Sequence, residues 1–295
     1  MRPHRSRSGA VFITLAALTV VAAVVGCAAP SEEPARGAAD SASEAEAVRS
    51  SEVIDLSRFD LVDLTYAYDE DTLFWPTATE IFELRSQAYG MTEGGYFYSA
   101  NTFSAPEHGG THLDAPIHFH ADGQTVDQVP LERLFARAVV IGVSAQAADD
   151  PDYRLSAADV AAWEAEHGAV PAGSVVLLRT GWSARWPDAL AYLGDDTPGD
   201  ASNLHFPSYG EEAARLLVEE RGVGMLGVDT ASIDHGASTD FMVHRVAAAR
   251  NVPGLENLAD LSALPATGAW VIALPIKIGG GSGGPVRVVA LVPRG

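Results

Sequence analysis

The sequence predicts a single α/β domain, because segments with strand and helix patterns alternate from Val53 to Gly295. Two unbroken apolar runs, Ala138–Val143 and Val175–Leu178, are typical of strands that are buried on both faces. Helical patterns follow them, at Ser156–Gly168 with a capping-box-like start and at Glu211–Glu220 with one apolar side. This length is ample for one domain with a real core.

Further strands are predicted where apolar and β-branched residues recur in short runs. They are Leu61–Thr65, Tyr96–Phe103, Met225–Thr230, Trp270–Ile278 and Val286–Val292. The glycine-rich segment Gly279–Gly284 is predicted to be a turn, because it lacks the lysine and the following helix of a phosphate-binding loop.

The first 26 residues have the pattern of a bacterial lipoprotein signal peptide. An arginine-rich start precedes the apolar run Val11–Val25, which is shorter than the roughly 20 residues that a membrane-spanning helix needs. Cys27, the only cysteine, follows this run and the small residue Gly26, so we expect it to be lipidated rather than to be an incidental thiol. Residues 27–52 lack large apolar side chains and are predicted to be a flexible tether to the domain at 53–295.

The chain is strongly acidic, with a formal net charge of −20. Such a charge disfavours binding to nucleic acid and to anionic membrane surfaces, and no basic patch offsets it. We therefore expect no nucleic-acid partner, and contact with the membrane only through a lipid anchor at Cys27, whereas the charge says little about the substrate. The protein would then lie on the outer face of the cell membrane.

The segment 108–119 carries the clearest chemical signal. Three histidines and one carboxylate occupy even positions in it: His108, His112, Asp114 and His118. An extended backbone would direct all four to one face, but a straight strand would separate the first from the last by roughly 33 Å. The segment must therefore bend to form a site, and Gly109-Gly110 and Pro116 can supply the bends.

Imidazole nitrogens and carboxylate oxygens together suit Zn(II), Mn(II) or Fe(II). The absence of a nearby thiol argues against a structural zinc site of the cysteine type. A lone histidine is usually structural, but four of the nine histidines lie between positions 108 and 120. This clustering predicts a hydrolytic metal centre.

The pattern H-x-G-T-H-x-D-x-P-x-H-F resembles the signature of the cyclase-like metal hydrolases, a family that includes formamidases and isatin hydrolases. The resemblance extends over nearly all of Val53 to Gly295. It implies a cyclase-like, swivelling β/β/α domain with a mixed sheet, and a homodimer or homotetramer.

Two later residues are candidates for the rest of the site. His244 lies in a helical pattern that Asp240 could cap, and Glu256 lies among apolar residues after Pro253-Gly254. Each alone would more often be structural. The resemblance favours both, because family members carry a late histidine and a glutamate twelve residues later.

The resemblance also implies a role for each residue. It assigns one metal to His108, His112, Asp114 and Glu256, and a second to Asp114, His244 and Glu256, as two Zn(II) or Mn(II) ions per chain. His118 would be the acid/base. Trp75 matches a Trp-Pro beside the substrate, although Thr77-Ala78 replaces the Gly-Asp that often follows, and Phe103 would add a second stacking surface.

The predicted activity is hydrolysis of an amide C–N bond in a small aromatic formamide or cyclic amide. Metal-bound hydroxide would attack the carbonyl carbon, and His118 would carry the proton. Hydrolysis of an ester or lactone, or a cyclisation, would use the same site. A non-enzymatic alternative is a surface lipoprotein that captures metal without catalysis. The presence of His118 in addition to a full set of metal ligands disfavours it, because metal capture needs no acid/base.

Overall fold

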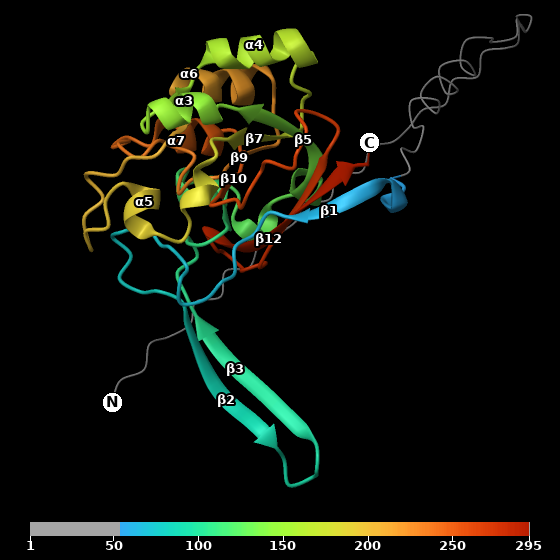
Figure 1. The fold of residues 1–295 in the computed structure, drawn as a ribbon, viewed down its shortest axis with the longest axis vertical. Coiled ribbons are helices and arrows are strands. Elements are labelled where there is room, and N and C mark those ends of the chain that lie inside the picture. Colours follow the sequence, from blue (N-terminus) through green and yellow to red (C-terminus); the bar gives the residue numbers. More distant parts are fainter. Residues whose placement is uncertain (1–53, 295) are drawn as a thin grey trace, which may run out of the picture. The chain divides into compact units, whose positions relative to one another are not determined.

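The computed structural model describes residues 54–294, which form one compact unit (Figure 1). The predicted signal peptide, the tether and Cys27 lie outside the described residues. Within residues 54–294, no helix has both the length and the hydropathy needed to cross a bilayer.

An eight-stranded mixed sheet forms the centre of the domain, in the order β1-β12-β11-β5-β7-β9-β10-β4. Its strands are β1 Phe59–Asp63, β4 His112–Asp114, β5 Phe135–Gly142, β7 Val175–Arg179, β9 Met225–Val228, β10 Gly254–Glu256, β11 Trp270–Pro275 and β12 Gly283–Pro293. The pairs from β5 through β7 and β9 to β10 are parallel, and the other pairs are antiparallel. Because β12 also pairs with β4, the sheet closes on itself in a barrel-like way.

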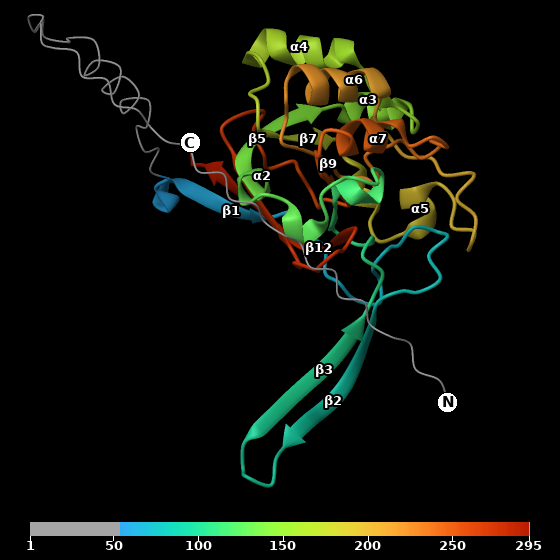
Figure 2. The ribbon, with the colours of Figure 1, turned by 180° about the vertical axis from the view of Figure 1, so that it is seen from behind.

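Helices cover one side of the parallel strands, as the views from both sides show (Figures 1 and 2). The α-helices are α2 Leu131–Leu134, α3 Ser144–Asp149, α4 Ala157–His167, α5 Ala189–Leu193, α6 Glu211–Arg215 and α7 Met242–Ala248. Shorter 3₁₀ turns lie at Leu56–Arg58, Pro116–His118, Val126–Gln128 and Trp182–Arg185, and the short strands β6 Arg154–Leu155 and β8 Ser208–Tyr209 pair with each other.

The parallel strands are buried on both faces, which explains their unbroken apolar sequences. In β7, Val176 and Leu178 belong to the cluster beneath the helices, whereas Val175 and Leu177 belong to the cluster shared with the antiparallel strands. The predicted α/β class with a mixed sheet is therefore confirmed.

The two predicted helices are also confirmed. Ser156 caps α4, because its hydroxyl accepts a hydrogen bond from the Asp159 amide at 3.1 Å, and the Asp159 carboxylate accepts one from the Ser156 amide at 2.8 Å. The second helix runs from Glu211 as predicted, but its last five residues, Leu216–Glu220, form a π-helical turn.

The prediction that Asp240 caps the helix of His244 is wrong. Helix α7 starts after Phe241, whose φ of 53° turns the chain sharply, and Asp240 is exposed. The cap comes instead from Asp234, whose carboxylate accepts hydrogen bonds from the Val243 and His244 amides, each at 3.0 Å.

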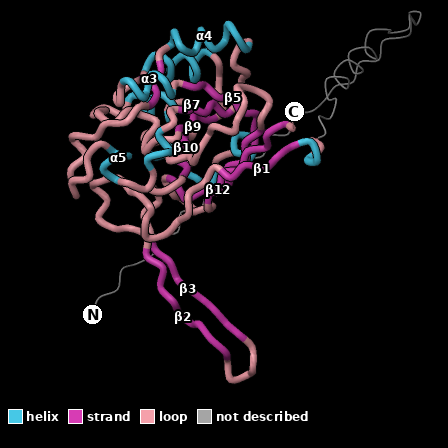
Figure 3. The backbone as a smooth tube through the Cα atoms, in the orientation of Figure 1, coloured by secondary structure: helices cyan, strands magenta, loops and turns pink. Residues whose placement is uncertain are grey.

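A long hairpin projects from the domain (Figures 1 and 3). It consists of β2 Glu83–Met91 and β3 Phe97–Ser104, which pair only with each other in the sheets of the described chain. The sequence predicts β3 as a strand that leads into the histidine motif, but it gives no prediction for β2. Residues 83–104 are called the arm below.

Candidate metal centre

The histidine motif bends as its sequence requires. Gly110, with a φ of 54°, makes the first turn, and a 3₁₀ helix that begins at Pro116 makes the second. Between them lies β4, which pairs with β10 so that His112 faces Glu256. As a result, the rings of His108 and His118 stack with their centroids 3.9 Å apart.

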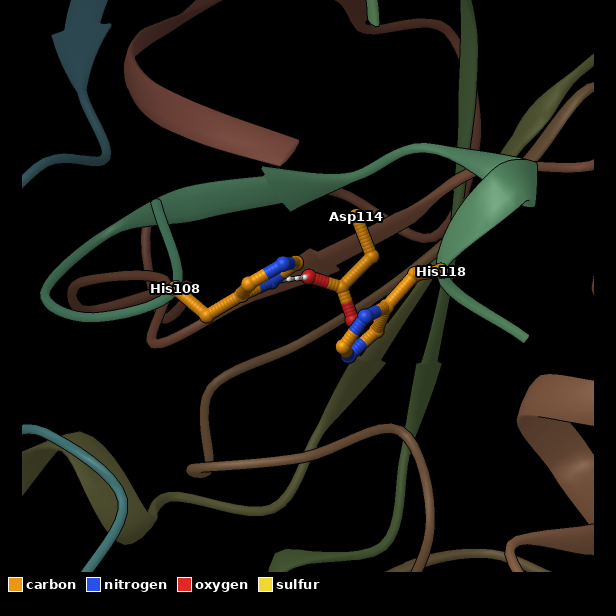
Figure 4. A group of neighbouring side chains, drawn as sticks. All are labelled: His108, Asp114 and His118. Carbon is orange, nitrogen blue, oxygen red and sulfur yellow. Dashed lines mark hydrogen bonds and ion pairs between the residues drawn. The ribbon is translucent and has the colours of Figure 1, made fainter. Parts of the chain in front are cut away.

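The five predicted metal ligands lie in one cluster, with the Asp114 carboxylate at its centre. Asp114 lies 2.6 Å from Nδ1 of His108, 3.1 Å from Nε2 of His112 and 3.0 Å from Nε2 of His244. Glu256 lies 3.4 Å from His112 and 3.2 Å from His244, measured to the same ring nitrogens. Figure 4 shows Asp114 between His108 and His118. Side chains from β4, β10 and α7 thus meet at one point.

The electrostatics of this cluster favour a bound cation. The side chains of His112, Asp114, His244 and Glu256 are all buried. Burial alone would raise the pKa of Asp114, but the His108 and His112 rings hold that pKa well below its usual range. Burial would likewise lower the pKa of His112, but the Asp114 and Glu256 carboxylates raise it to about 9.

Within residues 54–294, all the ion pairs of Asp114 and Glu256 are with histidines, so no lysine or arginine neutralises these buried carboxylates. Two groups of three residues are close enough to hold a metal ion: His108–Asp114–His118 and His112–Asp114–Glu256. Within each group, every residue offers one ligand atom, and these atoms lie within 4.8 Å of one another. Nitrogen and oxygen donors so arranged fit a divalent transition metal.

His118 differs from the other histidines in its surroundings. It faces the cavity, stacks on His108 and contacts the ring of Phe119, with centroids 4.5 Å apart. Loss of hydration lowers the pKa of His118 to about 4, so its ring is neutral at neutral pH.

Asp234 fixes the orientation of His244. Its Oδ2 lies 2.7 Å from Nδ1 of His244, while Nε2 of the same ring faces Asp114 and Glu256. A carboxylate behind a ligating histidine sets the ring orientation and raises its basicity. Sequence analysis does not identify Asp234, since the nine intervening residues carry no pattern that links it to His244.

Gly110 and Asn257 fix the orientation of His112 in a similar way. The Gly110 carbonyl accepts hydrogen bonds from Nδ1 of His112 at 2.9 Å and from Nδ2 of Asn257 at 2.8 Å. Because a carbonyl can only accept, Nδ1 of His112 carries a hydrogen, and Nε2 is the ring nitrogen that faces Asp114 and Glu256. Asn257 is held by the Tyr192 hydroxyl, which donates to its Oδ1 at 3.1 Å.

The cluster lines a cavity of about 280 Å³. The rest of the lining is mainly apolar and includes Leu73, Phe74, Trp75, Phe119, Leu193 and Phe241. Trp75 packs edge-on against Phe206, with centroids 6.3 Å apart, so its ring is held at the cavity wall. This cavity could enclose a flat aromatic molecule beside His118.

The structure places five predicted metal ligands, His118 and Trp75 around this cavity, and their individual roles stay predictions. Phe103 is the exception. It lies on β3 in the arm, is 56% exposed and does not line the cavity of its own chain. It packs instead near Phe82 at the base of the arm, with centroids 6.3 Å apart.

Comparison with known proteins agrees with this geometry. The Cyclase family model, described as "Putative cyclase", matches residues 62–235. Isatin hydrolase of Roseibium aggregatum is 39% identical over 209 residues, which cover 68% of this chain and 77% of that protein. Kynurenine formamidase of Salinibacter ruber is 28% identical over 233 residues, which cover 78% of this chain and 96% of that protein.

The fold is also similar to that of a crystal structure of an isatin hydrolase bound to the product analogue thioisatinate. The TM-score is 0.72 and the identity 32%, and the match covers 87% of this chain and 99% of that one. The chain therefore belongs to the cyclase family of metal hydrolases. Within that family it is a metal-dependent amidohydrolase, with a divalent metal expected at the buried histidine and carboxylate cluster.

Proposed function

We propose that this enzyme opens a cyclic amide fused to an aromatic ring, of the isatin class. The observation that carries this proposal is that aromatic side chains and the histidine and carboxylate cluster line the same cavity. Relatives named isatin hydrolase, one solved with thioisatinate, support the choice of substrate class. An aryl formamide is the second candidate, supported by the similarity to kynurenine formamidase.

The residues present would hold the cation between the rings of His108, His112 and His244 and the carboxylates of Asp114 and Glu256. Such an ion, Zn(II) or Mn(II), lowers the pKa of a water molecule and polarises a carbonyl oxygen. The presence of Asp114 in both ligand groups supports two ions per chain rather than one.

The chain itself supplies orientation and proton transfer. Trp75 and Phe119 would flank the aromatic ring and direct its carbonyl toward the cluster. The neutral ring of His118 would accept a proton from the attacking water and pass it to the leaving nitrogen. In this reaction the C–N bond breaks, the hydroxyl joins the carbonyl carbon and the hydrogen joins the nitrogen.

A substrate panel tests this proposal. The purified protein, loaded with Zn(II) or Mn(II), would be assayed on isatin, on formanilide and on an aryl lactone. We expect the highest kcat/KM for isatin, with opening of its ring. A preference for the lactone would contradict amide specificity, and metal-loaded protein without any turnover on the panel would favour the metal-capture alternative.

We also propose that the enzyme is an exported lipoprotein, held at the outer face of the cell membrane through Cys27. The support is the arginine-rich start, the short apolar run and the single cysteine that follows it after Gly26. The tether of residues 27–52 would let the domain act in solution near the membrane.

A further inference from the structure

His108 presents the opposite ring nitrogen from the other two histidines of the cluster. His112 and His244 face the carboxylates through Nε2, and the groups that fix their rings contact Nδ1. His108 instead faces Asp114 through Nδ1, at 2.6 Å, and Figure 4 marks this contact with a dashed line. A group that fixes the ring of His108 in the same way has to contact Nε2.

That contact comes from the glycine-rich segment at positions 279–284. Oγ of Ser282 lies 2.9 Å from Nε2 of His108. The hydroxyl of Ser282 donates a hydrogen bond to Oε2 of Glu107 at 2.6 Å, and the amide of Ser282 donates one to the same oxygen at 2.9 Å. The carbonyl of Ser282 accepts a hydrogen bond from the Ala115 amide at 2.9 Å. Both the side chain and the main chain of Ser282 are therefore held in place.

The number of hydrogens on these groups decides which nitrogen of His108 is protonated. A serine hydroxyl has one hydrogen, and a carboxylate can only accept, so the hydrogen of Ser282 is used by Glu107. The Ser282 oxygen is then left to accept from His108, which requires a hydrogen on Nε2. In a neutral imidazole the other nitrogen has a free lone pair. Nδ1 and Asp114 then present lone pairs to the same side, as two ligands of one cation do.

Two glycines leave room for this arrangement. A Cβ added at Gly281 would lie 2.7 Å from Oε1 of Glu107, and one added at Gly283 would lie 2.6 Å from Cε1 of His108. Gly283 is also the first residue of β12 and pairs with Asp114 in the sheet. A side chain at either glycine would displace one of these partners, so the composition of the segment is explained by its close approach to the cluster.

We propose that Ser282 and Glu107 are positioning residues that hold the ring of His108 with its hydrogen on Nε2, so that Nδ1 is directed to the metal site. Glu107 acts through Ser282. Without the carboxylate, the hydroxyl could turn and donate to Nε2, which favours the form of the ring with its hydrogen on Nδ1. The proposal rests on the divalent metal expected at the cluster and not on the choice of substrate.

Titration of the metal-free protein with Zn(II) tests this proposal without an enzymatic assay, so a failure to open isatin would bear on the proposed function alone. We expect Ser282→Ala and Glu107→Ala each to weaken Zn(II) binding about 10- to 100-fold, the usual effect of losing a partner behind a ligating histidine. Ser282→Thr keeps the hydroxyl and should bind Zn(II) like the wild type. Because Glu107 acts through Ser282, the double variant Ser282→Ala/Glu107→Ala should bind no more weakly than Ser282→Ala.

Asp127→Ala is the matched control. Oδ1 of Asp127 accepts hydrogen bonds from the Gly280 amide at 3.0 Å and from the Thr125 hydroxyl at 2.6 Å. Asp127 therefore also holds the glycine-rich segment, but in the described chain it makes no hydrogen bond to His108 or Ser282. This variant should keep the wild-type affinity for Zn(II), and circular dichroism would confirm that every variant is folded.

A second measurement observes the ring of His108 directly. In the long-range ¹H–¹⁵N spectrum of the wild type loaded with Zn(II), the ring hydrogen of His108 should lie on Nε2 and exchange slowly with solvent. In Ser282→Ala the same hydrogen should exchange faster, because its acceptor is lost.

Four results would overturn the proposal. Wild-type affinity for Zn(II) in Ser282→Ala would show that the hydroxyl does not support His108, and equal weakening by Asp127→Ala would assign the effect to the placement of the whole segment. Additive losses in the double variant would show that Glu107 does not act through Ser282. A ring hydrogen on Nδ1 of His108 in the Zn(II)-loaded protein would contradict the assigned form of the ring.

Discussion

Asp234 and His244 are joined by a 2.7 Å contact between Oδ2 and Nδ1, and the same carboxylate caps the helix that carries His244. One side chain therefore sets both the position of α7 and the orientation of its imidazole. Asp234→Asn should weaken metal binding by about 10- to 100-fold, the usual effect of losing such a partner. It should also lower the free energy of unfolding by about 1 kcal/mol through the weakened cap.

Metal titration followed by elemental analysis measures the first effect, and denaturant unfolding of the metal-free protein measures the second. Asp240→Asn is the matched control, since Asp240 is exposed and does not cap the helix. Equal metal affinity in the wild type and in Asp234→Asn would show that His244 needs no support from this carboxylate.

His118 and His112 should respond differently to truncation. His118→Ala should keep the metal and lower kcat by about 10²- to 10⁴-fold, the size of a general acid/base contribution. His112→Ala should instead lose metal, because its Nε2 faces both Asp114 and Glu256. Metal content and single-turnover rate would be measured on the same preparations. Normal metal content with a wild-type rate in His118→Ala would exclude His118 as the acid/base.

Gly110→Ala should destabilise the domain. The residue has a φ of 54°, and an added Cβ would lie 2.9 Å from side-chain atoms of Thr72 and Tyr68. Strain and overlap together should lower the free energy of unfolding by about 1–3 kcal/mol. Gly279→Ala is the control, because its Cβ would meet nothing within 4 Å. Chemical denaturation measures both, and equal stability of the two variants would contradict the argument.

The lipid anchor is tested by Cys27→Ser. The substitution should move the protein from the membrane fraction to the soluble fraction, because the tether alone has no apolar segment to hold it. Catalysis by the released protein should be unchanged, since residue 27 lies outside the domain. Fractionation followed by immunoblotting measures the distribution, and undiminished membrane attachment of the variant would refute lipidation.

The sequence predicts those parts of the site that lie in one motif or at a fixed spacing. The cluster of His108, His112, Asp114 and His118 is visible because its members are neighbours in the chain. His244 and Glu256 are found only through their family spacing. The fold class follows from strands such as β7, whose two buried faces require an unbroken apolar sequence.

Other features depend on contacts between distant segments, and no local pattern reveals them. Asp234 contacts His244 directly, and Asn257 donates to the Gly110 carbonyl that also holds His112, and both sets of hydrogen bonds form only when the loops come together. Its position in the sequence favours Asp240 as the cap of α7, but the turn at Phe241 prevents this. The hairpin of β2 and β3 contains a β-bulge between Ser86 and Ala88, which the alternation of residue types does not indicate.

Metal removal and restoration test the central claim most directly. Protein purified without chelator should contain one to two equivalents of a divalent transition metal per chain, lose isatin hydrolysis on dialysis against a chelator and regain it with stoichiometric Zn(II) or Mn(II). Elemental analysis and the ring-opening rate would be measured on each preparation. Metal-free protein that still hydrolyses isatin at the full rate would contradict the account.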